Sequence, residues 1–167
     1  GVQPQSATAG VTLNAVTVLV QDSLGNTATG SSAVVTLAID AGPAGATLLG
    51  TASVSVVDGV ATFRDLRLLK SGAEAAGTGY VLLATSTGFQ GVRSGTFDVL
   101  TGPADRLVFT TQPSDATLGT ALNAVQVTVR DSVGNVITTF TSAIALGITS
   151  GTGTTGAALG GTASVTP

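Results

Sequence analysis

The sequence predicts an all-β protein made of tandem two-sheet sandwiches with about seven short strands each. Apolar residues alternate with polar ones in short segments, and no segment keeps the period of an amphipathic helix. Turn-forming residues separate these segments about every 8 to 12 positions, and 23 of the 167 residues are glycine. Short alternating segments joined by tight turns are typical of a β-sandwich.

The strands predicted before residue 101 each carry apolar side chains on one face. They cover residues 13–22, 34–39, 52–56, 60–68, 79–87 and 96–100. Residues 70–79, rich in glycine and alanine, are expected to form an irregular loop. The residues expected to face the core are Val16, Val18, Val20, Val35, Leu37, Ile39, Val54, Val56, Phe63, Tyr80, Leu82, Ala84, Phe97 and Val99.

Two kinds of turn are predicted from residue types. Asp58 and Gly59 separate two apolar segments, and both tolerate the positive φ angles of a type I′ hairpin turn. The motif Asp-x-x-Gly-Asn follows a valine-rich strand twice, at Asp22–Asn26 and at Asp131–Asn135. In the structural interpretation, aspartate caps the turn while glycine and asparagine adopt left-handed backbone angles.

The repeated turn also offers the one cofactor hypothesis that the sequence supports. Carboxylate and amide oxygens are calcium ligands, so each turn could contribute to a calcium site at the end of a domain. The turn has only one carboxylate, however, and calcium usually takes more, which favours the structural interpretation. The weak calcium candidates are Asp22, Asn26, Asp131 and Asn135.

The chain repeats itself at an offset of 109 residues. Residues 3–26 and 112–135 share 15 identities in 24 positions without a gap, and the register resumes at 161–165 after a two-residue insertion. We therefore divide the chain into copy one (1–101), a linker (102–104) and copy two (105–167). Copy one has no counterpart of the opening segment 105–109, and copy two has none of Val57–Leu100, so copy two is expected to be the first half of a repeat.

The segments that each copy lacks relative to the other lead to an assembly hypothesis. A half-sandwich is expected to leave apolar side chains facing water along unpaired edges, which is unfavourable for a monomer. The missing strands are then supplied either by a neighbouring chain, through strand complementation, or by adjoining sequence of the same polypeptide. Both alternatives give an end-to-end string or filament. The predicted assembly residues are Leu107, Val108, Phe109, Val125, Val127, Val129, Ile144, Leu146 and Ile148.

Composition excludes several classes of function. The chain has no histidine and no cysteine, which removes Ser-His-Asp and Cys-His catalysis, disulfides and histidine-based zinc sites. The nine acidic residues fall mostly at predicted turns, so we expect no enzyme and no catalytic residues. Six scattered basic residues and a net charge of −3 do not favour nucleic acid as a partner. Apolar runs are strand-sized, so no membrane-spanning segment is expected.

The motifs resemble a known group of repeats. The series QP…AG…V.V.V.D..GN, then VTLAI, GTASV…DGVATF and GTGYVLLATS, is similar to the bacterial immunoglobulin-like repeats of the invasin type, found in tandem in surface and secreted proteins. The resemblance covers essentially the whole chain. It implies Greek-key immunoglobulin-like sandwiches on the bacterial cell surface or outside the cell.

The leading functional hypothesis is a non-catalytic structural repeat of a surface stalk or filament, whose partners are copies of itself or adjoining repeats. The alternative is an adhesive or carbohydrate-binding module for a glycan or host-surface ligand, which an exposed aromatic platform would indicate. A remote third option is an accessory domain of a secreted enzyme. Repetition favours the first, because tandem copies supply length.

Overall fold

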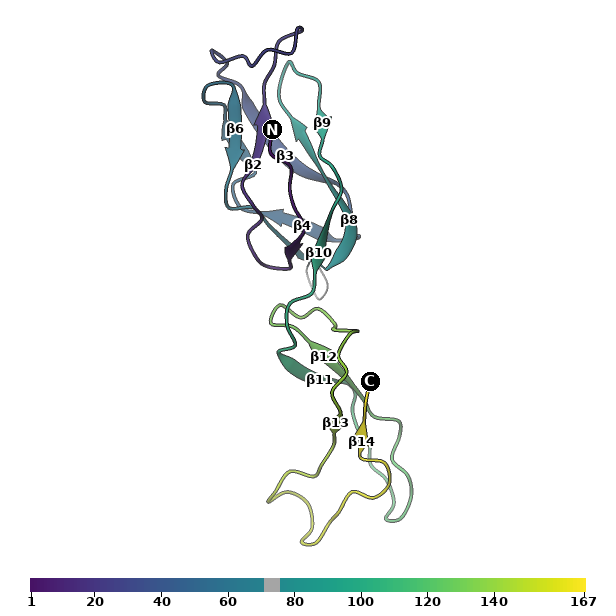
Figure 1. Ribbon diagram of the computed structural model, residues 1–167. Helices are drawn as coiled ribbons and strands as arrows, with labels where there is room; N and C mark the ends of the chain where they lie inside the picture. The colour runs from purple at the N-terminus through teal and green to yellow at the C-terminus, as the bar shows by residue number, and fades with distance from the viewer. Residues whose placement is uncertain (71–75) are drawn as a thin grey trace.

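The computed structural model describes residues 1–70 and 76–167, which form strands and turns without a helix. The largest element is a six-stranded mixed sheet that curls around the core of copy one (Figure 1). Neighbouring strands in this sheet are antiparallel, except that β1 and β10 are parallel to each other. In order across the sheet, the strands are β1 (Ala7–Thr8), β10 (Phe97–Leu100), β8 (Gly77–Thr85), β3 (Val34–Ala41) and β5 (Ser53–Ser55), with β9 (Val92–Arg93) paired to β8.

Two strand pairs complete copy one. β2 (Val16–Leu19) pairs antiparallel with β6 (Val60–Phe63), and β4 (Ala46–Leu49) pairs antiparallel with β7 (Arg67–Lys70). Their inward side chains join those of the six-stranded sheet in one apolar cluster. The largest buried apolar side chains of that cluster are Tyr80, Phe63, Leu66, Leu68 and Leu82.

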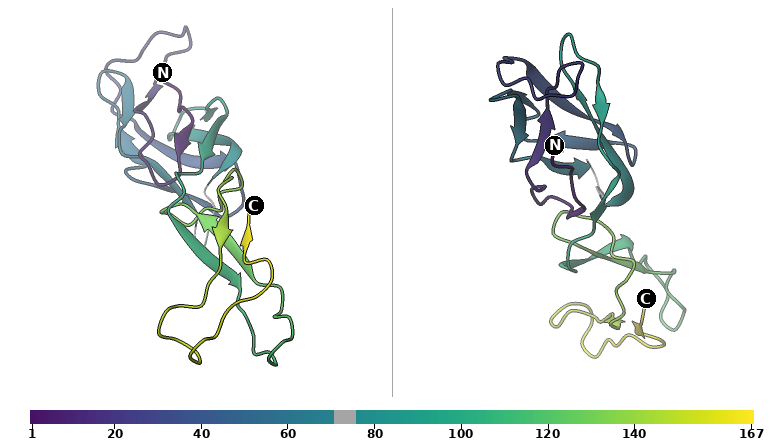
Figure 2. Two further views of the ribbon diagram at one scale, coloured as in Figure 1. Left: turned by 60° about the horizontal axis from the view of Figure 1, so that its bottom comes forward. Right: turned by 45° about the horizontal axis from the view of Figure 1, so that its top comes forward.

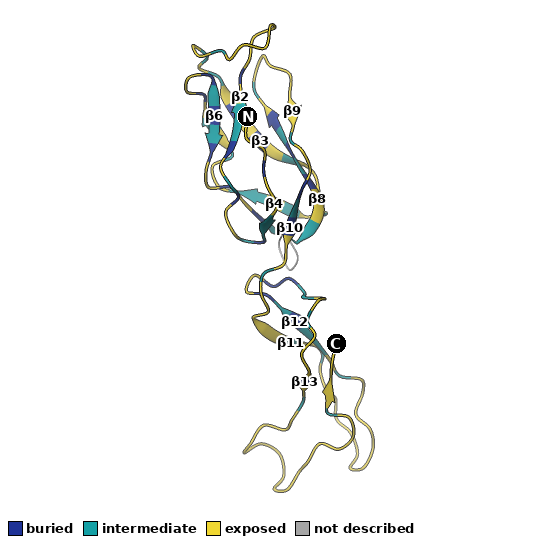
Figure 3. Ribbon diagram, viewed as in Figure 1, coloured by how far each residue is buried: buried dark blue, intermediate teal, exposed yellow. Residues whose placement is uncertain are grey.

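Copy two holds two further pairs. β11 (Arg106–Thr111) pairs antiparallel with β12 (Gln126–Arg130), and β13 (Ile144–Ala145) with β14 (Ser164–Val165). Figures 1 and 2 show copy two continuing from the end of copy one at which β10 finishes. Burial is concentrated in copy one, whereas much of copy two is exposed (Figure 3).

The predicted core residues of copy one are buried or half-buried, which confirms the alternation in β2, β3, β5, β8 and β10. The single strand predicted at 60–68 is wrong, because β6 and β7 belong to different pairs. Asp65 lies between them, and its carboxylate accepts hydrogen bonds from the Thr51 amide and hydroxyl at 2.9 and 2.8 Å. This contact turns the chain from one pair to the other.

Three strands were not predicted, namely β1, β4 and β9. The loop predicted at 70–79 is wrong at both ends, because residue 70 belongs to β7 and residues 77–79 to β8. The part at 71–75 lies outside the described residues.

The predicted Asp58-Gly59 hairpin turn is confirmed. Their φ angles are 49° and 77°, and the amides and carbonyls of Val57 and Val60 are mutually hydrogen-bonded at 3.0 and 2.9 Å. The flanking strands then separate, since β5 joins the six-stranded sheet and β6 pairs with β2. The turn therefore links the two sides of the core.

The two copies use the same contacts at matching positions. Asn14 accepts a hydrogen bond from the Gln5 amide, and Asn123 accepts one from the Ser114 amide, both at 2.7 Å. Val35 pairs with Val54 across two strands of copy one, and their counterparts Ile144 and Val165 pair in the same way in copy two. The second counterpart lies beyond the predicted two-residue insertion. The offset of 109 residues thus describes structural equivalence as well as sequence similarity.

The predicted exposure of the assembly residues is correct only in part. Val129 and Ile144 are buried, because the β12 and β13 regions already cover part of a core. Half-buried positions are Val108, Val125, Val127 and Leu146, and exposed positions are Leu107, Phe109 and Ile148.

Candidate functional site

The turn at Asp131–Asn135 is a buried polar network. One Asp131 carboxylate oxygen accepts hydrogen bonds from the amides of Val133 and Asn135, at 3.1 and 2.8 Å. The other accepts one from the Asn135 side-chain amide at 2.6 Å. The exposed fractions of Asp131 and Asn135 are 0% and 1%. Buried polar groups are retained where their hydrogen bonds are satisfied, and every one of these has a partner.

This network also binds copy one and the linker. The Gly102 amide donates to Asp131 Oδ2 at 2.8 Å, and the Ala76 amide donates to Asn135 Oδ1 at 3.4 Å. A Cβ on Gly102 would lie 3.3 Å from the Cβ of Asp131, so the linker backbone passes directly against the turn. The turn therefore lies in a junction between the two copies.

An apolar contact accompanies these hydrogen bonds. A Cβ on Gly10 would lie 2.9 Å from Val133 Cγ1, which places the valine against the loop that follows β1. Gly10 has a φ of 77°, a conformation that glycine adopts readily. A side chain at position 10 would therefore be strained, and Val133 Cγ1 would have to shift to make room for it.

The junction keeps the Asp131 carboxylate ionised. Burial alone would raise the pKa of Asp131, but the hydrogen bonds from Asn135, Gly102 and Val133 outweigh it and hold the pKa below its ordinary value. An ionised carboxylate is the better acceptor for these amides.

The equivalent turn of copy one forms the same internal network without a neighbour. Asp22 accepts hydrogen bonds from the amides of Leu24 and Asn26 at 2.9 Å, and the Asn26 side chain donates to it at 3.1 Å. The Asn26 side-chain hydrogen bond is the main cause that lowers the pKa of Asp22. Here both residues are exposed, and Leu24 is 86% exposed, compared with 45% for its counterpart Val133.

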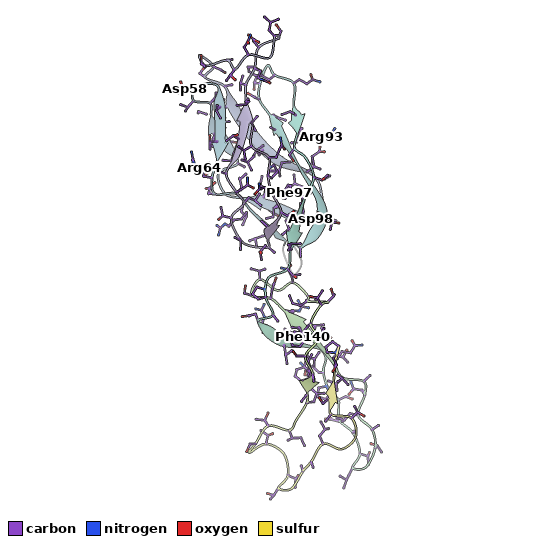
Figure 4. All side chains as sticks on the ribbon, viewed as in Figure 1. Asp58, Arg64, Arg93, Phe97, Asp98 and Phe140 are labelled. Atoms are coloured by element: carbon purple, nitrogen blue, oxygen red, sulfur yellow. The ribbon has the colours of Figure 1, made fainter. Side chains whose placement is uncertain are left out.

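A groove of about 490 Å³ runs along β2 in copy one. Its floor includes core residues of β2, β3 and β8, and one wall comes from the segment at β9. Arg93 on β9, labelled in Figure 4, lines the groove and is ion-paired to Asp40 at 2.7 Å. The apolar lining residues are Val2, Pro4, Val16, Val18, Leu19, Val20, Val35, Leu37, Leu82, Ala84, Phe89 and Val92.

Copy two has a second groove, of about 410 Å³. It is lined by Val125 and Val127 of the β12 region and by Ile144 and Leu146 of the β13 region. The structure therefore brings together most of the predicted assembly residues of these two segments. On the neighbouring strand β11, Leu107 lies opposite Val129 of β12, and Phe109 lies opposite Val127 of β12.

The four calcium candidates occur as two separate pairs, Asp22 with Asn26 and Asp131 with Asn135, whose carboxylates already accept several hydrogen bonds. Among residues 1–70 and 76–167, no three acidic residues gather in a group able to hold a metal ion. In the same part of the chain, no helix is long and apolar enough to cross a membrane.

Calcium provides a direct test of the two interpretations of the turn. We expect millimolar calcium to leave the melting temperature of the chain unchanged, because the carboxylate oxygens serve the turn and the junction. Differential scanning fluorimetry with and without chelator measures this. A calcium-dependent rise that disappears in the double variant Asp22→Ala, Asp131→Ala would contradict the structural interpretation.

Sequence reasoning found the repeated turn but missed its partners. The sequence places Gly102 in the linker and does not mark Ala76 or Gly10, because nothing local indicates a contact between distant segments. No known family model, curated protein or solved structure matches the chain.

Proposed function

We propose that this chain is a non-catalytic structural repeat of an extracellular stalk, in which successive immunoglobulin-like sandwiches are held end to end. The observation that carries the proposal is the junction at Asp131. Its carboxylate accepts hydrogen bonds from its own turn and from the Gly102 amide of the linker. A connection that only tethered two independent modules would not require a buried, fully bonded carboxylate.

The sandwich assignment is supported by the core of copy one. Side chains of β3, β8 and β10 from the curled sheet share one apolar cluster with those of β2 and β6. Two groups of strands around one core are the basic arrangement of a β-sandwich.

The exposed turn of copy one supports continuation of the array. It has the motif and the internal hydrogen bonds that copy two uses in the junction, yet its leucine faces solvent. Figure 1 shows the segment after β2 at the end of copy one that lies away from copy two. We expect this turn to dock against the linker of a preceding repeat, as the turn of copy two docks against Gly102.

Rigidity of the junction tests the stalk function. We expect small-angle X-ray scattering of the unmodified chain to fit one extended particle, and NMR relaxation to give one rotational correlation time for both copies. Independent tumbling of the two copies would contradict the proposal, because a flexible string does not set a distance. Reproducible glycan binding that is lost in Phe89→Ala would instead favour an adhesive module.

A further inference from the structure

The groove beside β2 lies along an edge of that strand where pairing has already begun. The Thr17 amide donates to the Val2 carbonyl at 3.1 Å, and the Val2 amide donates to the Thr17 hydroxyl at 2.6 Å. In an antiparallel ladder, the backbone groups of alternate residues point to the same side. The Leu19 amide therefore faces the same side as the Thr17 amide.

In copy two, the corresponding edge of β12 is paired with a strand, β11. In β11 and β12, Leu107 lies opposite Val129, and Phe109 lies opposite Val127. The 109-residue offset carries these two valines onto Val20 and Val18, and both line the groove of copy one.

The same alignment fixes where an added strand would enter. The pair Thr111 and Gln126 in copy two corresponds to Val2 and Thr17 in copy one, which are already hydrogen-bonded. A segment equivalent to Asp105–Phe109 therefore leads directly into Gly1. Side chains alternate across a strand, so Leu107 and Phe109 would share the groove-facing side and Val108 would face away.

We propose that this groove binds the opening strand of a repeat, an extended segment of the Asp105–Phe109 type joined directly to Gly1. It pairs antiparallel with β2 and places its leucine and phenylalanine over Val20 and Val18. The valines and leucines in the groove lining suit two apolar side chains spaced two residues apart. This inference rests on the proposed arrangement of tandem repeats and identifies the segment that completes the sandwich of copy one.

The test places residues 105–109 directly before Gly1 of the full chain. Burial of one leucine and one phenylalanine should raise the melting temperature of copy one by about 5 °C or more. Hydrogen exchange at the Leu19 amide should slow by about tenfold or more, because that amide gains a partner.

Substitutions within the added strand provide matched controls. Leu107→Ser and Phe109→Ser should each remove most of the stabilisation, whereas Val108→Ser should retain it. An unchanged melting temperature and Leu19 exchange rate, or equal losses from all three substitutions, would overturn the proposal. The stalk function is judged separately, from the rigidity of the unmodified chain, so the two failures are distinguishable.

Discussion

Replacing Asp131 with alanine is expected to release copy two from copy one. The substitution removes the acceptor of the Gly102, Val133 and Asn135 amides in a fully buried position. Leaving these buried and part-buried donors without their acceptor should cost about 3 kcal/mol, shared between the turn and the junction. In NMR relaxation measurements, the two copies should then tumble with separate correlation times, and the scattering profile should become that of a flexible pair.

The same change in copy one is the control. Asp22→Ala removes the same internal hydrogen bonds from an exposed turn, so it should leave the junction and the relative motion of the copies unchanged. If both variants loosened the molecule equally, or if Asp131→Ala left it rigid, the junction would not depend on this carboxylate.

Acid should weaken the junction as Asp131→Ala does, because it protonates the Asp131 carboxylate. The folded-state pKa of Asp131 is lowered relative to the ordinary value of 3.8. Its contribution is therefore complete above that ordinary value and is lost as the pH falls through the lower folded-state pKa. Relaxation measurements in a titration below about pH 4 should show loosening in the wild type and little further change in Asp131→Ala.

The sequence predicts most strands of copy one because their signal is local. Val35 and Leu37 alternate with Val34, Thr36 and Ala38, and the structure buries the first two and exposes the other three. The break at Asp65 could not be predicted in the same way, because it depends on Thr51, 14 residues earlier in the chain. Strands β1 and β9 have two residues each, too few for a periodic pattern.

At the candidate site too, the sequence predicts what is local and not what depends on distant segments. The identical turn motifs predict the same internal hydrogen bonds, and the structure has them in both copies. Their burial differs because only the turn of copy two meets a linker and the Gly10 loop. Burial by a neighbouring repeat is a property of the array, and no local residue pattern encodes it.

Supplying the strands absent from copy two should produce the largest gain in stability. Val165 matches Val54, so residues 57–100 can follow Pro167 directly in register. In copy one, this segment contains β8, which pairs with β3 and carries the buried core residues Tyr80 and Leu82. The appended segment should likewise pair with β13 and close the groove of about 410 Å³ on copy two.

We expect the extended chain to melt cooperatively in its second copy, at a temperature about 10 °C or more above that of the unmodified copy two. Leu107 and Phe109, now 53% and 45% exposed, should become buried, and their coverage alone accounts for several kcal/mol. Calorimetry measures the melting temperature. Amide exchange at Ala145 and Gly147, the counterparts of Thr36 and Ala38 on β3, measures the new pairing, because the Leu146 amide already donates to the Ala163 carbonyl. Light scattering should show less self-association, because an open edge that can pair with another chain is removed.

An appended segment with serine in place of Tyr80 and Leu82 is the matched control, since it keeps the length and turns but loses the core-facing side chains. It should leave copy two as unstable as in the unmodified chain. A copy two that already melts cooperatively at the higher temperature, without any appended strand, would show that half a repeat forms an adequate core. In that case, the exposure of Leu107 and Phe109 on β11 would need an explanation other than the lack of residues 57–100 in copy two.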